Sequence, residues 1–157
     1  MPRRSLLLQL VASSSFIVVG SLTIVTWFSL HSIRGLYLDR TADRLTASAT
    51  LLAPQIKTFS ETEDWGRAQA HIAELSRKTQ TRYTVILPNG TVVADSDESP
   101  SLMASHRDRP EIQEAMQAGK GVATRYSSTM QEKMMYAAVA TSEPHETAII
   151  IRAAMSI

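Results

Sequence analysis

The chain opens on a long apolar run. Residues 5–30 carry no charged side chain, and Arg3 and Arg4 precede them. A helix of these 26 residues would measure about 39 Å, enough to cross a bilayer core of about 30 Å. We interpret residues 1–30 as a cytoplasmic N-terminus followed by a membrane-spanning signal anchor. A cleaved signal peptide is the alternative, although the apolar core of such a peptide is shorter and no Ala-x-Ala triplet closes this run.

The placement of charge around this run predicts the topology. Arginines that precede a span favour a cytoplasmic N-terminus. The expectation is therefore a single pass through the cell (inner) membrane, with residues 31–157 as a separate domain on the periplasmic or extracellular side.

A second periodicity follows the run. Apolar or small residues recur at alternating intervals of four and three, the spacing of a heptad seam on a long helix over residues 31–59. Either this seam packs on the core of its own domain, or it is a signalling helix that pairs with a second copy in a homodimer. Both hold if the first turns pair and the later ones cover the domain. Pro54 predicts a kink near residue 50. The seam residues are Leu38, Ala42, Leu45, Ala49, Leu52, Ile56 and Phe59.

The remaining elements follow from caps, turns and β-rich runs. Ser60 and Glu63 have the spacing of a capping box, which predicts a second helix over residues 61–78. Pro88-Asn89-Gly90 separates two β-rich runs and predicts a hairpin of residues 82–87 and 91–95. Pro110 and Gly119 bracket a short helix over residues 111–118. Three further strands are predicted at residues 122–128, 134–141 and 147–155, with turns at 129–133 and 142–146.

This order predicts an α+β fold. A long helix and a second helix precede a five-stranded antiparallel sheet over residues 81–157, with a helical crossover between its second and third strands. The last strands are nearly continuous apolar runs. Strands of this kind are covered on both faces of a sheet, so we expect helices or loops on each side.

Composition excludes several functions. The formal net charge is +1, of which Arg3 and Arg4 supply +2, so residues 31–157 carry −1. A nearly neutral domain without a Lys/Arg run is not expected to bind nucleic acid. The absence of cysteine excludes disulfides, thiolate zinc sites and a cysteine nucleophile.

Motifs for catalysis or for metals are missing from the sequence as well. The four histidines lie far apart in the chain, and residues 95–98 lack the remaining ligands of a calcium loop. Ser127 and Ser128 have no histidine and aspartate nearby, and no glycine-rich phosphate loop is present. We expect no enzyme activity, cofactor or metal in this chain.

Three motifs in the second half carry a family resemblance. They are Asn89-Gly90-x-Val-Val-Ala-Asp95-Ser96, His106-x-x-Arg109-Pro110-Glu111 and Gly119-x-Gly121 followed by Thr124-Arg125-Tyr126-Ser127. With the N-terminal span and the long helix, they resemble the extracytoplasmic PAS-like (Cache, or PDC) sensor domain of bacterial sensor histidine kinases, of the phosphate-regulon sensor kinase type. The same sensor type also precedes the output domains of chemoreceptors and diguanylate cyclases.

The resemblance implies a longer receptor. Proteins of this kind continue into a second span and a kinase core that acts on a response regulator, whereas this sequence ends at Ile157 without a kinase motif. We therefore expect the N-terminal portion of such a kinase, truncated before the second span. The alternative is a small membrane-anchored scaffold or interaction protein of the cell envelope.

The resemblance also implies a ligand cavity between the sheet and its overlying loop. Arginine's planar fork suits a carboxylate or phosphate, so a small anionic ligand is expected. The alternatives are ion pairs at the surface for the arginines, a solvated loop position for His106, and a cap on the turn after its strand for Asp95. The expected wall residues are Arg109, Arg125, Tyr126 and Tyr136, with Asp95 and His106 at the rim.

Overall fold

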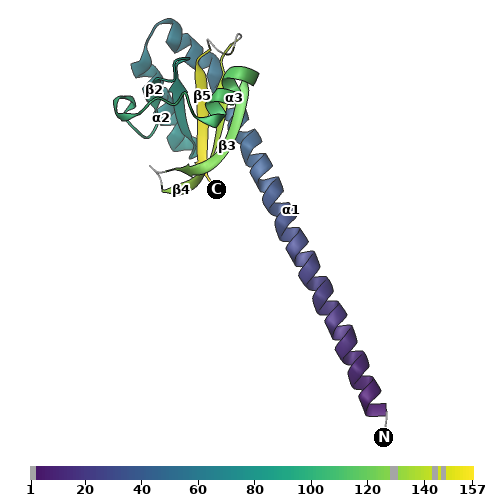
Figure 1. Cartoon of the computed structure of the whole chain (residues 1–157). Coiled ribbons are helices and arrows are strands. Elements are labelled where there is room, and N and C mark those ends of the chain that lie inside the picture. The colour runs from purple at the N-terminus through teal and green to yellow at the C-terminus, as the bar shows by residue number, and fades with distance from the viewer. Residues whose placement is uncertain (1–2, 128–130, 143–144, 146–147) are drawn as a thin grey trace. The chain divides into compact units, whose positions relative to one another are not determined.

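The computed structural model describes residues 3–127, 131–142, 145 and 148–157. The chain forms two compact units, Met1–Asp39 and Arg40–Ile157. The first helix, α1, begins at Arg3 and ends at Glu61, so it contributes to both units (Figure 1).

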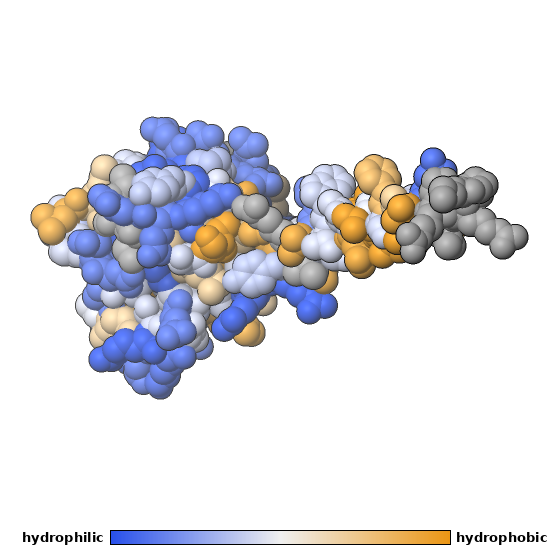
Figure 2. Space-filling view, turned by 90° about the horizontal axis from the view of Figure 1, so that it is seen from below, coloured by the Kyte–Doolittle hydropathy of each residue, from blue (hydrophilic) through white to orange (hydrophobic). Residues whose placement is uncertain are grey.

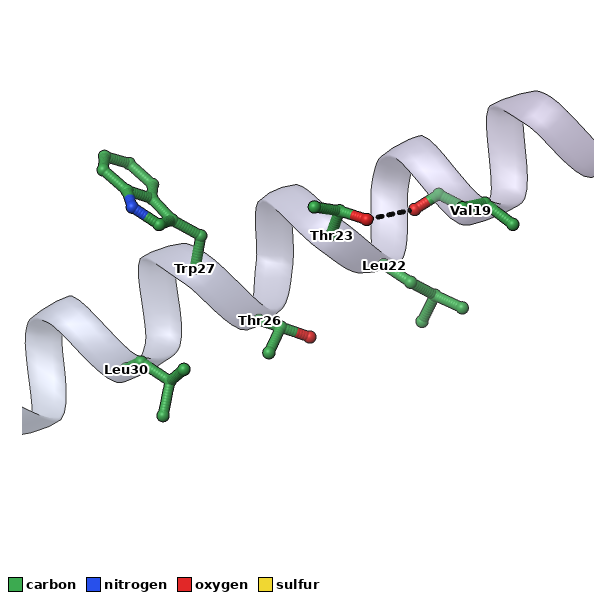
Figure 3. Close-up of a pocket in the computed structure, with 6 residues that line it drawn as sticks. All are labelled: Val19, Leu22, Thr23, Thr26, Trp27 and Leu30. Carbon is green, nitrogen blue, oxygen red and sulfur yellow. Dashed lines mark hydrogen bonds between the residues drawn. The ribbon is translucent and has the colours of Figure 1, made fainter.

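The first unit is an apolar helix without a protein core. Its most hydrophobic window has a mean hydropathy of 1.9 and none of it is buried, so this helix is long and apolar enough to cross a membrane. Hydroxyl groups within it bond to the preceding turn, as Thr23 does to the Val19 carbonyl at 2.8 Å. Figure 3 shows a hollow on this helix that is lined by α1 alone, so it is a groove between side chains and not an enclosed site.

The second part of α1 packs into the core of the second unit. Leu45, Ala49, Leu52 and Ile56 are buried there, whereas Leu38 and Ala42 are only half-buried. The interpretation of the seam as a core-packing face is therefore confirmed for its later turns. Pro54 lies inside α1 and does not end it.

The junction between the first two helices differs from the prediction. Helix α2 is Trp65–Thr79, and its N-cap is Asp64, whose carboxylate accepts a hydrogen bond from the Arg67 N–H at 3.1 Å. The predicted capping box is wrong, because α1 continues through Ser60 to Glu61. Glu63 then turns the chain with a positive φ of 51°.

The sheet has five antiparallel strands in the order β2-β1-β5-β4-β3. The predicted hairpin is confirmed, and its turn contains Gly90 at φ +88°. The predicted crossover helix is also confirmed as α3, Pro110–Ala118, with Gly119 as its left-handed C-cap. The strands are β1 Arg82–Ile86, β2 Val92–Asp95, β3 Lys120–Ser127, β4 Glu132–Ala140 and β5 Ile150–Ser156.

The end of the sheet and the segment after β2 differ from the prediction in detail. The last strand begins at Ile150, later than predicted, and a short 3-10 helix, η1, Pro100–Leu102, follows β2. Residues 128 and 147, and parts of the turns predicted at 129–133 and 142–146, lie outside the described residues.

Both faces of the sheet are covered, as the apolar strands predicted. Helix α3 packs on one face through Ile112 and Ala115, which join a core cluster with Ile86, Ala138 and Ile150. Tyr83 is on the other face, where it lines a groove together with residues of α1 and α2. Hydrophilic side chains dominate the visible surface around this unit in Figure 2.

Candidate functional site

Charged side chains gather on the face of the sheet that α3 covers. The strand register places Asp95, Thr84 and Arg152 side by side on β2, β1 and β5. The neighbouring row on this face contains Arg82 and, two strands away, Tyr136. Because alternate residues of a strand share a face, these side chains all point to the α3 side.

Two carboxylates and three guanidiniums connect within this group, which we call the arginine cluster: Arg82, Arg125, Arg152, Asp95 and Glu111. One Arg152 nitrogen donates to the Thr84 hydroxyl at 2.9 Å, and the other lies 3.6 Å from Glu111 Oε1. The same Glu111 oxygen accepts from Arg125 at 3.3 Å. The Arg125 and Arg152 guanidiniums lie 4.0 and 5.1 Å from the centre of the Tyr136 ring, close enough for a cation–π attraction.

Asp95 is held differently from Glu111. Arg82 donates to both of its oxygens at 3.0 and 3.2 Å, and the Thr84 hydroxyl donates to Oδ2 at 2.7 Å. The backbone N–H groups of Asp97 and Glu98 also donate to Oδ1, each at 3.0 Å. Asp95 therefore caps the turn after its strand, the alternative that the sequence offered for it.

The arginine cluster holds more positive than negative charge, and some of its polar atoms have no partner. Among the described residues, no hydrogen bond reaches the buried atoms Glu111 Oε2, Arg125 Nε and Arg152 Nε. Burial lowers the pKa of Arg152 to about 10, against the opposing effect of Glu111 and Asp95, so it stays charged at neutral pH. Buried polar groups are rarely left without a partner. Here the two Nε–H groups lack an acceptor and the Glu111 oxygen lacks a donor.

One end of the arginine cluster reaches solvent. The Glu111 and Arg152 side chains are 0 % and 3 % exposed, whereas that of Arg125 is 24 % exposed. Arg125 lies on β3, which is an edge strand of the sheet. Arg125 is therefore the most solvent-exposed member of the cluster.

The structure brings together some of the predicted site residues and separates others. Arg125 and Tyr136 are in contact, and Asp95 joins them through Thr84 and Arg152. Tyr126 is 65 % exposed and alternates with Arg125 along β3, so it points to the other side of the sheet and does not contribute to the cluster. Arg109 is the N-cap position of α3, where its backbone carbonyl accepts from the Ile112 and Gln113 N–H groups.

His106 is buried and is not the solvated loop residue that the sequence allowed. Its Nδ1 lies 2.9 Å from the Ala104 carbonyl oxygen, and its backbone N–H donates to the Gly90 carbonyl. Burial, and after it the positive charge of Arg152, lowers the pKa of His106 to about 4. The ring is therefore neutral at physiological pH.

Sequence reasoning missed Arg82, Arg152 and Glu111. Arg152 had a signal, because it is the one charge within the apolar stretch of residues 148–155. A lone arginine in a buried strand needs a partner. Glu111 gave no such signal in the sequence. It follows Pro110 at the start of a helix, where an acidic residue is common.

The comparisons with known proteins concern this fold. No family model and no curated protein matches the chain. Among solved structures, the sensor domain of the V. cholerae histidine kinase DctB is similar, with a TM-score of 0.62, 16% identity, and coverage of 80% of this chain and 51% of that one. The chain shares its fold, helices packed on a five-stranded antiparallel sheet, with this sensor domain.

Two receptor structures carry the same fold. A methyl-accepting chemotaxis protein from Vibrio parahaemolyticus matches with a TM-score of 0.56 and 13% identity over 82% of this chain and 97% of that one. The ligand-binding domain of the Pseudomonas fluorescens chemoreceptor CtaA, in complex with L-leucine, matches with a TM-score of 0.51 and 11% identity over 77% and 50%. This chain thus spans about half the length of the DctB and CtaA domains.

Proposed function

We propose that this chain is the extracytoplasmic signal-sensing module of a membrane-bound two-component sensor histidine kinase. The observation that carries the proposal is the buried arginine cluster, with its excess of positive charge and unpartnered atoms, in a PAS-like (Cache) fold. The apolar helix of the first unit supports a membrane anchor. In this proposal residues 1–30 anchor the chain with its N-terminus in the cytoplasm, and residues 31–157 sense outside it.

The proposed ligand is a small anion with a carboxylate or phosphate group. Arg125 and Arg152 both direct a guanidinium toward the same buried place, and each keeps a free Nε–H. Charged donors of this kind bind oxyanions with short, strong hydrogen bonds. The proposed site consists of Arg125, Arg152, Glu111 and Tyr136, with His106 and Asp95 adjacent.

Signalling in this proposal passes through α1. A homodimer would pair the early seam positions Leu38 and Ala42, since Leu45, Ala49, Leu52 and Ile56 are buried in their own chain. A ligand shifts such an assembly only if it binds two states with different affinity, typically by about 1–3 kcal/mol. The cognate response regulator would meet kinase domains encoded beyond residue 157.

A chemoreceptor is the second candidate, because the fold is shared with a methyl-accepting chemotaxis protein and with the ligand-binding domain of a chemoreceptor. The two candidates share the sensing module and differ in the output domain. The coding DNA downstream of codon 157 separates them. A histidine kinase core supports the first candidate, and a long helical signalling domain without one supports the second.

Thermal unfolding of the purified chain in detergent tests the sensing role. Acetate, succinate and inorganic phosphate serve as probes, and at least one is expected to raise the Tm of the wild type. Arg125→Gln should abolish that rise, because it removes the solvent-accessible guanidinium of the cluster. Arg77→Gln, which changes an exposed arginine of α2, is the matched control and should keep it. A panel of anions without effect on the wild type would refute the anion site.

A further inference from the structure

Glu111 occupies the place in which an anionic ligand would bind. Its carboxylate lies between Arg125 and Arg152, at 3.3 and 3.6 Å, and is completely buried. Both contacts use the single oxygen Oε1, while Oε2 has no partner among the described residues. The two arginines in turn each keep an unused Nε. The pairing is therefore incomplete on both sides.

The second carboxylate of the cluster shows what a complete pairing looks like in this protein. Asp95 uses both oxygens and receives hydrogen bonds from Arg82, Thr84 and two backbone N–H groups. Arginine and carboxylate form their strongest pairs when both oxygens take part. Asp95 is thus a fully hydrogen-bonded structural partner of Arg82. Glu111, in contrast, is bound through one oxygen only, by two arginines whose Nε–H groups have no acceptor among the described residues.

We infer that Glu111 is an internal carboxylate that competes with the anionic ligand, so that a ligand carboxylate displaces it from Arg125 and Arg152. The inference rests on the proposed anion site and adds how that site is regulated. Without ligand, Glu111 neutralises part of the excess positive charge. With ligand, the two guanidiniums bind the external carboxylate and Glu111 loses its ion pairs.

The exchange would loosen α3. Glu111 is the second residue of α3, and its ion pairs join the start of this helix to β5 through Arg152 and to β3 through Arg125. The helix also packs on the sheet through Ile112, Ala115 and Met116, and the Val122 N–H donates a hydrogen bond to Glu114 Oε2 at 3.1 Å. Loss of the Glu111 pairs would remove the ion pairs that attach the first turn of α3 to β3 and β5.

Chemical rescue in the full chain tests the inference. Glu111→Ala removes a CH2–COO⁻ group, which acetate replaces in both size and charge. Acetate should bind Glu111→Ala about tenfold more tightly than the wild type, because an internal competitor that occupies its site about nine-tenths of the time weakens apparent affinity by that factor. Acetamide has nearly the same shape without the charge and should not bind. Glu98→Ala changes an exposed glutamate outside α3 and should bind acetate as the wild type does.

The outcomes separate the inference from the proposed function. If the wild type binds acetate and Glu111→Ala binds it no more tightly, internal competition is refuted while the anion site stands. If neither protein binds acetate, succinate or phosphate, the anion site is refuted and the inference with it.

Two further measurements keep the test decisive if Glu111→Ala does not fold. Glu111→Gln retains the volume of the side chain and should bind succinate more tightly than the wild type. In the wild type itself, saturating succinate should accelerate amide hydrogen exchange in α3. Unchanged or slower exchange in α3 with succinate bound would overturn the displacement of Glu111.

Discussion

Gly121 lets α3 rest directly on the backbone of β3. A Cβ at this position would overlap the Glu111 carbonyl oxygen and would lie 2.7 Å from Glu114 Cβ and 3.0 Å from Ala115 N. Two of these three atoms are helix backbone, which cannot move aside as the end of a flexible side chain would. We therefore predict that Gly121→Ala displaces α3 and destabilises the second unit.

The expected magnitude follows from this overlap. Ordinary contact between such atoms needs about 3.5 Å, so the first turn of α3 has to shift by several tenths of an ångström or more. Overpacking of this kind costs about 1–3 kcal/mol. Alanine also restricts the unfolded chain, which offsets about 0.4–1 kcal/mol. The net loss is about 1–2 kcal/mol, which corresponds to a Tm lower by about 4–10 °C for a unit of this size.

Thermal unfolding of the full chain in detergent, followed by near-ultraviolet circular dichroism, measures this loss. Gly66→Ala is the matched control, since the same added methyl group in α2 would meet only Asp64 Oδ1 at 3.8 Å. That variant should be as stable as the wild type or more so by up to about 1 kcal/mol, because alanine favours a helix. The reasoning fails if Gly121→Ala matches Gly66→Ala in stability.

Two further predictions concern His106 and Asp64. The pKa of His106 is lowered to about 4 from 6.5 in the folded protein, so the unfolded chain binds a proton that the folded chain does not, and stability falls as the pH drops from about 6.5 to about 4. The loss in free energy of unfolding is at most about 3.4 kcal/mol, and solvent screening reduces it to about 1–2 kcal/mol. Denaturant titrations across this pH range should show a smaller loss for His106→Gln than for the wild type. Asp64→Ala removes the hydrogen bond to the Arg67 N–H and should lower the free energy of unfolding by about 1 kcal/mol. Asp108→Ala, which removes an exposed carboxylate outside the helices, is the control for surface charge and should leave the free energy of unfolding unchanged.

The order of elements was predictable because it rests on local chemistry. Gly90 and Gly119 both adopt positive φ angles, at 88° and 80°, which is the conformation that the turn and the helix end demanded of them. The apolar strands likewise predicted that both sheet faces are covered. The prediction of a capping box was wrong because Ser60 could either end one helix or begin the next. In the structure it lies in the last turn of α1.

The site was only partly predictable, because its partners come from distant parts of the chain. The Arg152–Thr84 hydrogen bond joins residues 68 positions apart, and the pair of Arg125 and Glu111 depends on how α3 lies over the sheet. Local sequence patterns do not predict such contacts between residues that are far apart in the chain. The alternation of β3 did separate Arg125 from Tyr126, and the structure bears out that the two point to opposite sides.

In the proposed function, a signal from the arginine cluster would have to cross the sheet to reach α1, because the two lie on opposite faces. Strand β5 is placed to carry it: Arg152 faces the cluster, while its neighbours Ile151 and Ala153 are completely buried on the other side. Ala153 is paired with Tyr83, which lines a groove together with Leu52 of α1. Close-packed interiors transmit small displacements because they contain little free space. If the proposed anion site is correct, an anion that repositions Arg152 would shift β5 and, through Tyr83, the buried side of α1. The seam residues that pack within their own domain would then be the part of α1 that responds to the ligand.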